Sequence, residues 1–379
     1  MAPVPDALHH QAAGHHEYIV VGAGVLGLSA AWALGRRGRQ VLVLDTAAPG
    51  NPLSGSKGDA RIFRLSYPDA AYVQMAAEAL TLWRALESQS GLPLLHLAGL
   101  VSIGDDLPAI AAAMDLAGAP CELLSGDEGR RRFPHLRVSG DCLFEATSGV
   151  LAADACLRAL CAGDTFTVRH GDAVSALHDE GDTVVVALDG GGVLSADVVV
   201  NCAGPGALAL LPGAVVAAAA PPSLQQVVYL APRVPVDELP LFIEWGPDMM
   251  YGLPVPGRGL LKLSHHTPGS PVTTSLAELP LDDDPRLVEL LLQAAARLLP
   301  DFSPAPVDTE RCVYDNTADT DFIIDRVGRI VIGCGTSGHG FKFGPLLGEA
   351  LADLATGAAL RLEPGRFALN RDGRPAATS

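Results

Sequence analysis

Short apolar runs rich in β-branched residues alternate with glycine turns and with longer stretches of small and apolar residues, a pattern typical of an α/β fold. The first run, residues 18–21, leads directly into a glycine-rich turn. The residues after the turn predict a helix through Arg37, and residues 41–44 predict a second strand. The amino-terminal segment is therefore expected to form a strand–helix–strand unit.

This unit has the glycine spacing of a dinucleotide site. Gly22-Ala-Gly24-Val-Leu-Gly27 opens the helix, and Asp45 closes the second strand. Such glycines permit a tight turn, close approach of a pyrophosphate and close packing of helix on strand. Unpaired N–H groups at the helix start bind phosphates, and Asp45 is placed to accept hydrogen bonds from a ribose. The motif predicts a bound dinucleotide and leaves FAD and NAD both open.

A second pair of strands is predicted over residues 183–188 and 197–201, which a glycine-rich turn joins. The second strand of this pair ends in Cys-Ala203-Gly204. A buried strand that ends in this way lets the backbone pass close to a flat or phosphorylated group. An ordinary turn is the alternative interpretation.

The carboxy-terminal segment favours a flavin over a nicotinamide. Residues 330–332 predict a strand, which leads into a loop that contains Gly338, Gly340 and Lys342, and a helix over 346–355 follows. The positive end of this helix faces back towards the loop. A reduced flavin is anionic around N1, and a helix start with Lys342 would stabilise that charge. A packing turn with a solvated lysine is the alternative.

Composition limits the class of protein. The chain has 379 residues, 49% of them hydrophobic, and a net charge of −17, which argues against nucleic acid or an anionic membrane as partner. Apolar runs such as 214–220 are far shorter than the roughly 20 residues of a membrane span. Seven cysteines without a CxxC pair predict a reduced, cytoplasmic protein without a structural metal. Residues 1–16 lack the apolar core of a signal peptide and predict a disordered tail, with metal binding by their four histidines as the alternative.

Lysine is rare and its positions are informative. It occurs three times, as Lys57, Lys262 and Lys342, and 23 of the 26 cationic residues are arginine. Codon bias in a GC-rich genome explains the rarity but not the three places where lysine remains. An ammonium and a guanidinium differ in hydration, pKa range and geometry. These lysines are therefore candidates for sites that need an ammonium.

Six motifs, taken in order, resemble one enzyme family: Arg61-Ile-Phe-Arg64, Tyr251-Gly-Leu-Pro, Lys262-Leu-Ser-His-His266, Cys312-Val-Tyr314, Asp321-Phe-Ile-Ile-Asp325 and Ser337-Gly-His-Gly-Phe-Lys342. From Glu17 to Phe367 the chain resembles the monomeric sarcosine oxidase and N-methyltryptophan oxidase group of the D-amino-acid-oxidase-like FAD-dependent oxidoreductases. The resemblance implies an α/β (α+β) fold with a Rossmann-like FAD-binding domain and a substrate domain built on an antiparallel sheet.

It also implies how the chain is divided. The FAD-binding domain is expected to be discontinuous, over residues 17–82, 145–212 and 320–367. The substrate domain is expected over 83–144 and 213–319, and a tail over 368–379.

The resemblance assigns two residues to the flavin ring. Cys312 matches the cysteine that binds the flavin covalently through a thioether, which fixes the ring and raises its potential. A buried, inert thiol is the alternative. Lys262 matches the lysine that promotes reaction of the reduced flavin with oxygen, because a fixed cation stabilises developing superoxide. The alternative for Lys262 is a strand lysine exposed to water.

Further residues match substrate-binding positions. Arg64 and Lys342 match the pair that binds the substrate carboxylate, although Arg64 could instead pair with a surface acid such as Asp59. Tyr251, His266 and Tyr314 match residues that line the pocket near the substrate amine. A pocket wall of aromatic and imidazole rings favours the neutral form of the amine, because only this form has a lone pair on nitrogen to drive the oxidation.

The remaining cofactor-binding candidates are Ser56 and Arg61, the latter as a flavin-edge arginine or as a surface residue. Three positions depart from the family pattern. Lys57 stands where sarcosine oxidase has histidine, Ala60 replaces a hydroxyl residue, and Trp245 would reshape the far wall of the pocket. These departures leave the substrate open.

Together these features predict an oxidase of a secondary or cyclic amine bearing a carboxylate, a monomer that uses FAD and oxygen and releases an imine and hydrogen peroxide. Three rivals remain. One is a dehydrogenase that hands electrons to a carrier, or a biosynthetic imine-forming flavoenzyme. Another is a non-catalytic FAD-bound assembly protein. The third, an NAD-linked reductase, gives the carboxy-terminal motifs no purpose.

Overall fold

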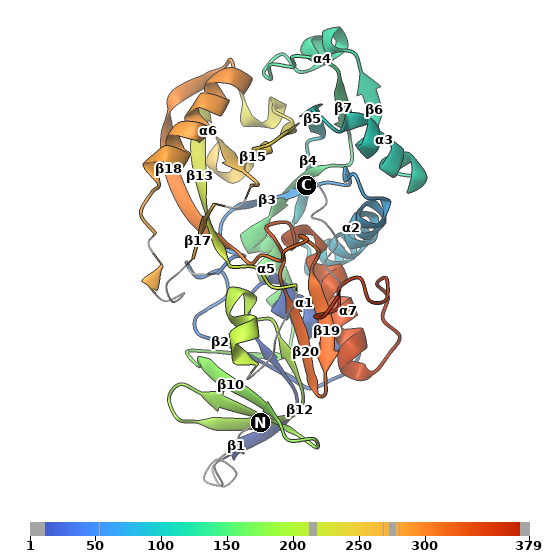
Figure 1. The fold of residues 1–379 in the computed structure, drawn as a ribbon, viewed down its shortest axis with the longest axis vertical. Helices are drawn as coiled ribbons and strands as arrows, with labels where there is room; N and C mark the ends of the chain where they lie inside the picture. Colours follow the sequence, from blue (N-terminus) through green and yellow to red (C-terminus); the bar gives the residue numbers. More distant parts are fainter. Residues whose placement is uncertain are drawn as a thin grey trace. The chain divides into compact units, whose positions relative to one another are not determined.

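The computed structural model describes residues 12–52, 54–211, 218–267, 269–272, 278–279 and 281–371. Two compact units divide the chain (Figure 1). The first unit is formed by Met1–Lys57, Leu157–Pro222 and Tyr314–Thr378, and the second by Gly58–Cys156 and Ser223–Val313.

The first unit is built on a sheet whose central strands are parallel. Its path runs β10-β11-β12-β1-β2-β9, with β20 beside β12 and β19 beside β20. Parallel ladders join β1 to β2, β1 to β12, β2 to β9 and β12 to β20, and the outer pairs β10–β11, β11–β12 and β19–β20 are antiparallel. The strands are β1 (Ala12–Val21), β2 (Val41–Asp45), β9 (Thr167–His170), β10 (Val174–Asp179), β11 (Val184–Leu188), β12 (Val193–Asn201), β19 (Ile323–Val327) and β20 (Ile330–Cys334).

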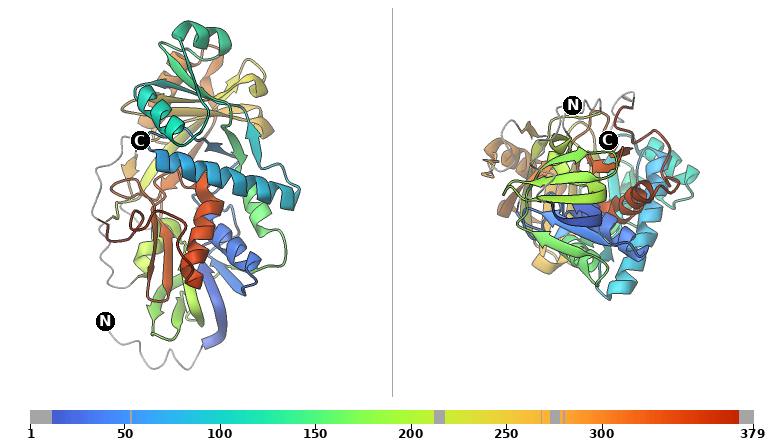
Figure 2. Two further views of the ribbon diagram at one scale, coloured as in Figure 1. Left: turned by 90° about the vertical axis from the view of Figure 1, so that its right-hand side faces the viewer. Right: turned by 90° about the horizontal axis from the view of Figure 1, so that it is seen from below.

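Two helices of this unit pack tightly on each other: α1 (Val25–Arg36) and α7 (Gly344–Thr356) (Figure 2). At their contact a Cβ on Gly348 would lie 2.5 Å from the Cβ of Ser29, so only glycine fits there. The unit also contains the 3₁₀ segments η1 (Gly204–Leu210) and η5 (Phe341–Phe343). Helix α5 (Ala153–Cys161) crosses the boundary between the two units.

The second unit is built on a larger sheet with the path β17-β13-β16-β15-β14-β5-β7-β6 and with β18 beside β13. Its strands are β5 (Leu100–Gly104), β6 (Glu122–Leu124), β7 (Cys142–Glu145), β13 (Ser223–Pro232), β14 (Leu241–Trp245), β15 (Met250–Val255), β16 (Leu260–His265), β17 (Ser270–Pro271) and β18 (Phe302–Tyr314). A small sheet holds β3 (Ala60–Phe63), β8 (Gly149–Ala152) and β4 (Leu95–Leu97). The helical segments are α2 (Ala70–Ser90), α3 (Leu107–Leu116), α4 (Gly126–Arg132), α6 (Pro285–Leu298), η2 (Val236–Glu238) and η3 (Pro256–Arg258).

The two faces of the larger sheet differ in character. Phe242, Met250 and Leu263 belong to one apolar cluster with Leu291 and Ala295 of α6, so this face is core. Because side chains alternate along a strand, the neighbouring residues lie on the opposite face. That opposite face holds the cross-strand partners Ile243, Tyr251 and Ser264 in one row, and Leu253, Lys262 and Tyr229 in another.

The structure corrects the expected chain ends. Strand β1 begins at Ala12, and His15 and His16 pair with Ser195 and Ala196 of β12, so a disordered tail over residues 12–16 is wrong. At the other end Leu369 and Arg371 are buried, so the expected tail is wrong for residues 368–371. The rest of both expected tails lies outside the described residues.

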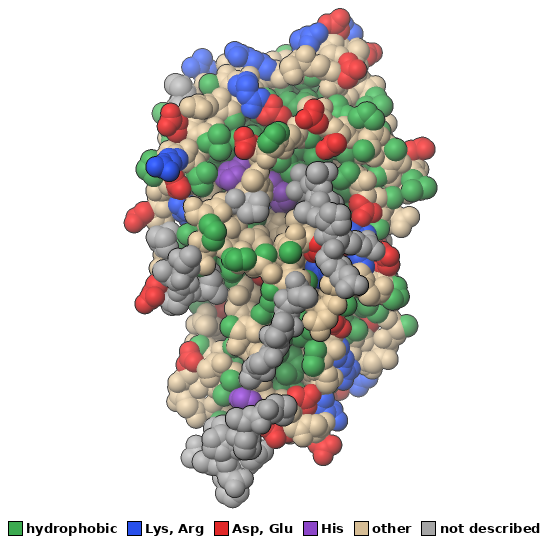
Figure 3. Space-filling view, in the orientation of Figure 1, with side chains coloured by type: hydrophobic (Ala, Val, Ile, Leu, Met, Phe, Trp, Pro, Cys, Tyr) green, Lys and Arg blue, Asp and Glu red, His purple; other side chains and the backbone are tan. Residues whose placement is uncertain are grey.

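The surface carries charges of both signs. On the face drawn in Figure 3, acidic and basic side chains are interspersed rather than separated by sign. Among the described helices, none combines the length and the apolar character that crossing a bilayer requires.

Candidate active site

The first glycine turn of the first unit has the geometry of a phosphate-binding turn. Gly22 has φ +100°, and a Cβ there would lie 2.3 Å from the carbonyl oxygen of Cys202. A Cβ on Gly27 would meet the carbonyl oxygen of Gly22 at 1.8 Å, so helix and strand are in direct contact. No acidic residue stands in the first turn of α1, and no side chain caps it at Gly24. Gly22 and Gly27 thus permit the tight turn and the close contact of helix and strand that their spacing predicts.

Asp45 and Ser56 fix this turn. One carboxylate oxygen of Asp45 accepts a hydrogen bond of 2.6 Å from the Ala23 N–H, and the other accepts one of 3.1 Å from the Ala47 N–H. Ser56 Oγ is buried and accepts a hydrogen bond of 2.9 Å from the Val25 N–H at the start of α1. A hydroxyl therefore occupies a helix start that is electrostatically suited to an anion.

The second predicted turn follows β12. Asn201 closes it by donating a hydrogen bond of 2.8 Å to the carbonyl of Ala207. Ala203 precedes the 3₁₀ segment η1, and Gly204 has φ +56° with no atom within 4 Å of the place that a Cβ would take. This turn lies beside the first one, because Cys202 donates its N–H to the carbonyl of Val21.

The carboxy-terminal loop is held by a buried acid that the sequence analysis missed. Asp315 accepts a hydrogen bond of 2.6 Å from the Gly335 N–H, and burial raises the pKa of Asp315 to about 6. Gly338 has φ +75°, and a Cβ there would lie 2.1 Å from the ring of Tyr314. A Cβ on Gly340 would meet Thr336 at 2.6 Å. The loop packs closely on the Tyr314 ring only because glycine stands at 338.

Lys342 is buried, with 3% of its surface exposed, so a solvated lysine is wrong. Its ammonium donates a hydrogen bond of 3.0 Å to the carbonyl of His339. His339 itself packs on Phe322, with ring centroids 4.8 Å apart, and its Nε2 lies 3.0 Å from the carbonyl of Thr320. The loop therefore holds an ammonium inside the first unit, directly before α7.

Lys262 of β16 is also buried, with 6% of its surface exposed, so a strand lysine in water is wrong as well. Burial, and then the charge of Arg61, lower the pKa of Lys262 to about 8, while Glu310 and Cys312 act in the opposite direction. Tyr229, its partner across the strand ladder, has its ring centroid 5.9 Å from the Lys262 ammonium nitrogen.

Glu310 is a carboxylate that acts on the charge of Lys262 and also lies close to Tyr229 and Arg61. The phenol of Tyr229 donates a hydrogen bond of 2.7 Å to Glu310. A Cβ on Gly58 would stand 3.7 Å from both the Arg61 guanidinium and a Glu310 oxygen, so the two side chains meet at this glycine. Cys312 lies two residues further along β18 and is half-buried. The structure thus brings Arg61, Lys262 and Cys312 into one charged cluster around Glu310.

Among the candidate cations of the second unit, Arg64 is the most buried, with 4% of its surface exposed. Its guanidinium donates to the carbonyl of Ser66 and lies 3.8 Å from the ring centroid of Tyr67 and 5.1 Å from that of Trp245. Across the described part of the chain, no carboxylate lies within ion-pair distance of it, and Asp59 pairs instead with Arg258 at 3.7 Å. A surface ion pair for Arg64 is therefore wrong.

A buried carboxylate shapes the segment that carries Arg64. Glu145 accepts hydrogen bonds of 2.9 Å from the Leu65 N–H and 3.0 Å from the Ser66 N–H. Burial raises the pKa of Glu145, and these hydrogen bonds oppose the rise. Burial also raises the pKa of Tyr67 to about 12, so its phenol is neutral beside the guanidinium. Glu145 thus orders the backbone and leaves the Arg64 guanidinium without an ion-pair partner.

Tyr251 and His266 are assigned by the strand register to the sheet face that carries Lys262. Tyr251 lies on the same sheet face as Lys262, and His266 directly follows β16, where its N–H donates a 3.0 Å hydrogen bond to Met249. Alternation along the strand assigns His266 to the face of Lys262 and Ser264. His265 belongs to the opposite face.

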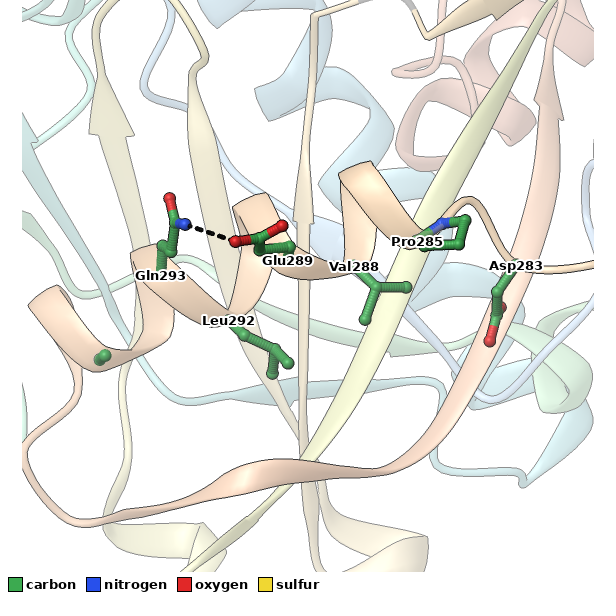
Figure 4. Close-up of a pocket in the computed structure, with 7 residues that line it drawn as sticks. Asp283, Pro285, Val288, Glu289, Leu292 and Gln293 are labelled. Atoms are coloured by element: carbon green, nitrogen blue, oxygen red, sulfur yellow. Dashed lines mark hydrogen bonds between the residues drawn. The ribbon is translucent and has the colours of Figure 1, made fainter.

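A pocket of about 550 Å³ lies elsewhere in the second unit, along the outer side of α6 (Figure 4). Pro285, Val288 and Leu292 line it together with polar residues of the same helix. No residue that the sequence analysis selected belongs to it, and it is wide open to solvent. We therefore assign it no part in catalysis.

The parallel sheet, the glycine turn at α1 and the buried ammonium before α7 define a dinucleotide-binding protein whose turns fit a flavin nucleotide. Residues 17–354 match the family described as FAD dependent oxidoreductase, and the chain belongs to this family. The family predicted from the six motifs, the fold class and FAD as cofactor are thereby confirmed.

Named relatives and a solved structure agree with this assignment. Peroxisomal sarcosine oxidase of Homo sapiens is 31% identical over 360 residues, covering 89% of this chain and 91% of that protein. N-methyl-L-tryptophan oxidase of Yersinia pestis is 28% identical over 381 residues, covering 94% and 99%. The structure of NikD, an unusual amino acid oxidase essential for nikkomycin biosynthesis, is 28% identical with a TM-score of 0.82, covering 94% and 98%.

Proposed function

We propose that the protein is an FAD-dependent oxidase of secondary or cyclic amines that carry a carboxylate. The observation that carries this proposal is the Arg64 guanidinium, which is buried and has no carboxylate within ion-pair distance in the described residues. A buried charge is costly unless it is paired. A substrate carboxylate would supply the missing partner, and a planar guanidinium can bind it through two hydrogen bonds.

When bound, FAD would supply the two-electron oxidation of the carbon beside the amine nitrogen and the return of those electrons to oxygen, so that amine and oxygen become imine and hydrogen peroxide. The chain's own groups prepare this reaction. Arg64, with Lys342, binds the carboxylate. Tyr251, His266 and Tyr314 favour the neutral amine, because aromatic and imidazole walls do not stabilise an ammonium as water does.

On the cofactor side, Gly22, Gly24, Gly27, Asp45 and Ser56 hold the nucleotide, and Ala203, Gly204, Gly338 and Gly340 let the backbone approach it. Lys262 and Arg61 supply positive charge where superoxide develops. Cys312 would hold the flavin through a thioether to the ring methyl; oxygen would be the oxidant for this bond and would take up the two hydrogens lost. The chain acts as a monomer in the cytoplasm.

Anaerobic reduction of the bound flavin tests the proposal. N-methyl and cyclic amino acids should bleach its visible absorption, and the same amines without a carboxylate should not. In air, one hydrogen peroxide should appear for each substrate consumed. Flavin reduction without peroxide would instead identify a dehydrogenase or an imine-forming enzyme that uses another acceptor. Failure of a broad amine panel to reduce the flavin would favour a non-catalytic FAD-bound protein.

A further inference from the structure

The indole N–H of Trp245 is a buried donor without an acceptor. Trp245 ends strand β14 with 3% of its surface exposed, and its Nε1 has no hydrogen-bond partner among the described residues. Buried donors in folded proteins are almost always paired, so a lone one needs an explanation. An acceptor that is not part of the chain, such as a ligand atom, is one explanation.

The Arg64 guanidinium lies next to the Trp245 ring and also has N–H groups without an observed acceptor in the described part of the chain. The Arg64 guanidinium carbon is 5.1 Å from the Trp245 ring centroid, and of its five N–H groups one is seen to donate, to the carbonyl of Ser66. Tyr67 contacts the guanidinium at 3.8 Å. Two aromatic rings thus restrict the orientation of the guanidinium and leave donors of Arg64 and Trp245 close together.

Trp32 shows why the combination matters. Its Nε1 also has no partner among the described residues, and Arg36 lies 4.4 Å from its ring centroid. Arg36, however, is 45% exposed at its side chain and pairs with Glu349 at 3.4 Å. A lone indole N–H therefore does not by itself indicate a ligand. At Trp245 the lone N–H coincides with a buried cation that has no ion-pair partner.

We propose that Trp245 is a substrate-recognition residue, whose indole N–H donates to the same carboxylate that Arg64 binds. A carboxylate offers about four lone-pair sites, enough for a two-pronged guanidinium and an additional donor. The site then selects free carboxylates and disfavours esters, amides and amines without an acid group, because those leave one or both donors unsatisfied. This inference rests on the proposed function, since it concerns the same substrate.

The test uses the FAD-loaded enzyme and two probes of the same shape. 2-Furoate is a planar carboxylate, and 2-furamide has the same ring with a neutral amide. Binding of each probe is followed by the change in the visible absorption of the bound flavin. Trp245→Phe removes the N–H and keeps a ring beside Arg64. We expect it to weaken 2-furoate binding by roughly 10- to 100-fold, the range for a hydrogen bond to a charged group, and 2-furamide binding much less.

Two further variants separate the outcomes. Trp32→Phe makes the identical change at the other buried indole and should leave both affinities unchanged. Arg64→Gln should abolish the preference for 2-furoate. If Trp245→Phe weakens both probes equally, or neither, while Arg64→Gln behaves as expected, Trp245 only packs and the inference is overturned. If the wild type shows no preference for 2-furoate and Arg64→Gln changes nothing, carboxylate recognition fails, and the inference with it.

Discussion

The phenol of Tyr229 donates a hydrogen bond of 2.7 Å to Glu310, and the ring of Tyr229 lies 5.9 Å from the ammonium nitrogen of Lys262. Burial, and next the charge of Glu310, raise the pKa of Tyr229, so the phenol stays protonated and remains a donor well above its ordinary range. Glu310 therefore acts on Lys262 through its charge and, by holding Tyr229, through the position of a neighbouring ring.

Glu310→Gln should lower the pKa of Lys262 further. Burial and Arg61 already lower that pKa to about 8, and Glu310 is the leading group that raises it, ahead of Cys312 and Asp59. Removing the carboxylate charge should shift the pKa downward by roughly 1 unit or more. Stopped-flow reoxidation of the reduced enzyme by oxygen should then begin to slow at a correspondingly lower pH.

Asp308→Asn is the matched control for this change. Asp308 is on the same strand as Glu310 and pairs with Arg258 at 2.7 Å. It is not among the groups that change the pKa of Lys262. Its reoxidation profile should match the wild type. A Glu310→Gln profile that also matches the wild type would show that Glu310 does not act on Lys262.

Lys262→Met should change both reactivity and stability. Loss of a fixed positive charge at the oxygen site should slow reoxidation by about 10²- to 10³-fold, while substrate reduces the flavin at a similar rate. The pKa of Lys262 is about 8 folded and 10.5 as a free side chain, so between these values the folded state binds fewer protons. Wild-type stability should therefore rise with pH across that window, and thermal unfolding of Lys262→Met should lack this rise. Equal pH dependence in both proteins would contradict the assignment.

Gly22→Ala should prevent FAD binding or unfold the first unit. The new Cβ would lie 2.3 Å from the Cys202 carbonyl oxygen, at a φ of +100° that side chains rarely adopt. The flavin content of purified protein and its thermal unfolding measure the effect. Gly190→Ala is the control, because no atom lies within 4 Å of a Cβ there. Full FAD loading of Gly22→Ala would show that the turn tolerates a side chain.

Local patterns could be predicted from the sequence. The turn at Gly22, the helix after it and the buried ends of β12 and β20 depend on residues a few positions apart, where period and glycine spacing carry the information. Boundaries were less well predicted. Strand β12 begins at Val193 rather than 197, because residues 193–196 pair with β11. Helix α7 begins at Gly344 rather than 346, and Pro345 occupies its first turn, where no N–H is needed.

Partnerships between distant residues could not be predicted. Glu145 accepts a hydrogen bond from the N–H of Leu65, which is 80 residues away in the sequence. Tyr229 donates a hydrogen bond to Glu310, which is 81 residues away. A carboxylate in a sequence carries no mark of whether it is buried or of which N–H it will meet. The sequence predicts Trp245 as a wall of the pocket. That its buried indole N–H has no acceptor among the described residues depends on the folded structure and cannot be predicted from the sequence.

Cys312→Ala should release the flavin from denatured protein. Acid-precipitated wild type should form a yellow pellet, because a thioether survives denaturation, and the variant should leave the colour in the supernatant. Cys334→Ala is the control, since Cys334 is a buried thiol whose pKa is raised well above its usual value by burial. A colourless wild-type pellet would rule out the covalent bond without affecting FAD as the cofactor.

Arg371→Ala should strongly destabilise the first unit. The Arg371 guanidinium makes two hydrogen bonds of 2.7 Å to Asp319 and a further one to the carbonyl of Phe322, and both charged side chains are buried. Removing one partner leaves a buried carboxylate unpaired, which costs about 3–5 kcal/mol. Glu122→Ala breaks the exposed pair with Arg132 and should change stability far less, because water screens this pair. Equal losses of unfolding free energy in chemical denaturation would show that the carboxy-terminal segment does not stabilise the loop at Asp319. The next residue of that loop, Thr320, has its carbonyl 3.0 Å from His339 Nε2.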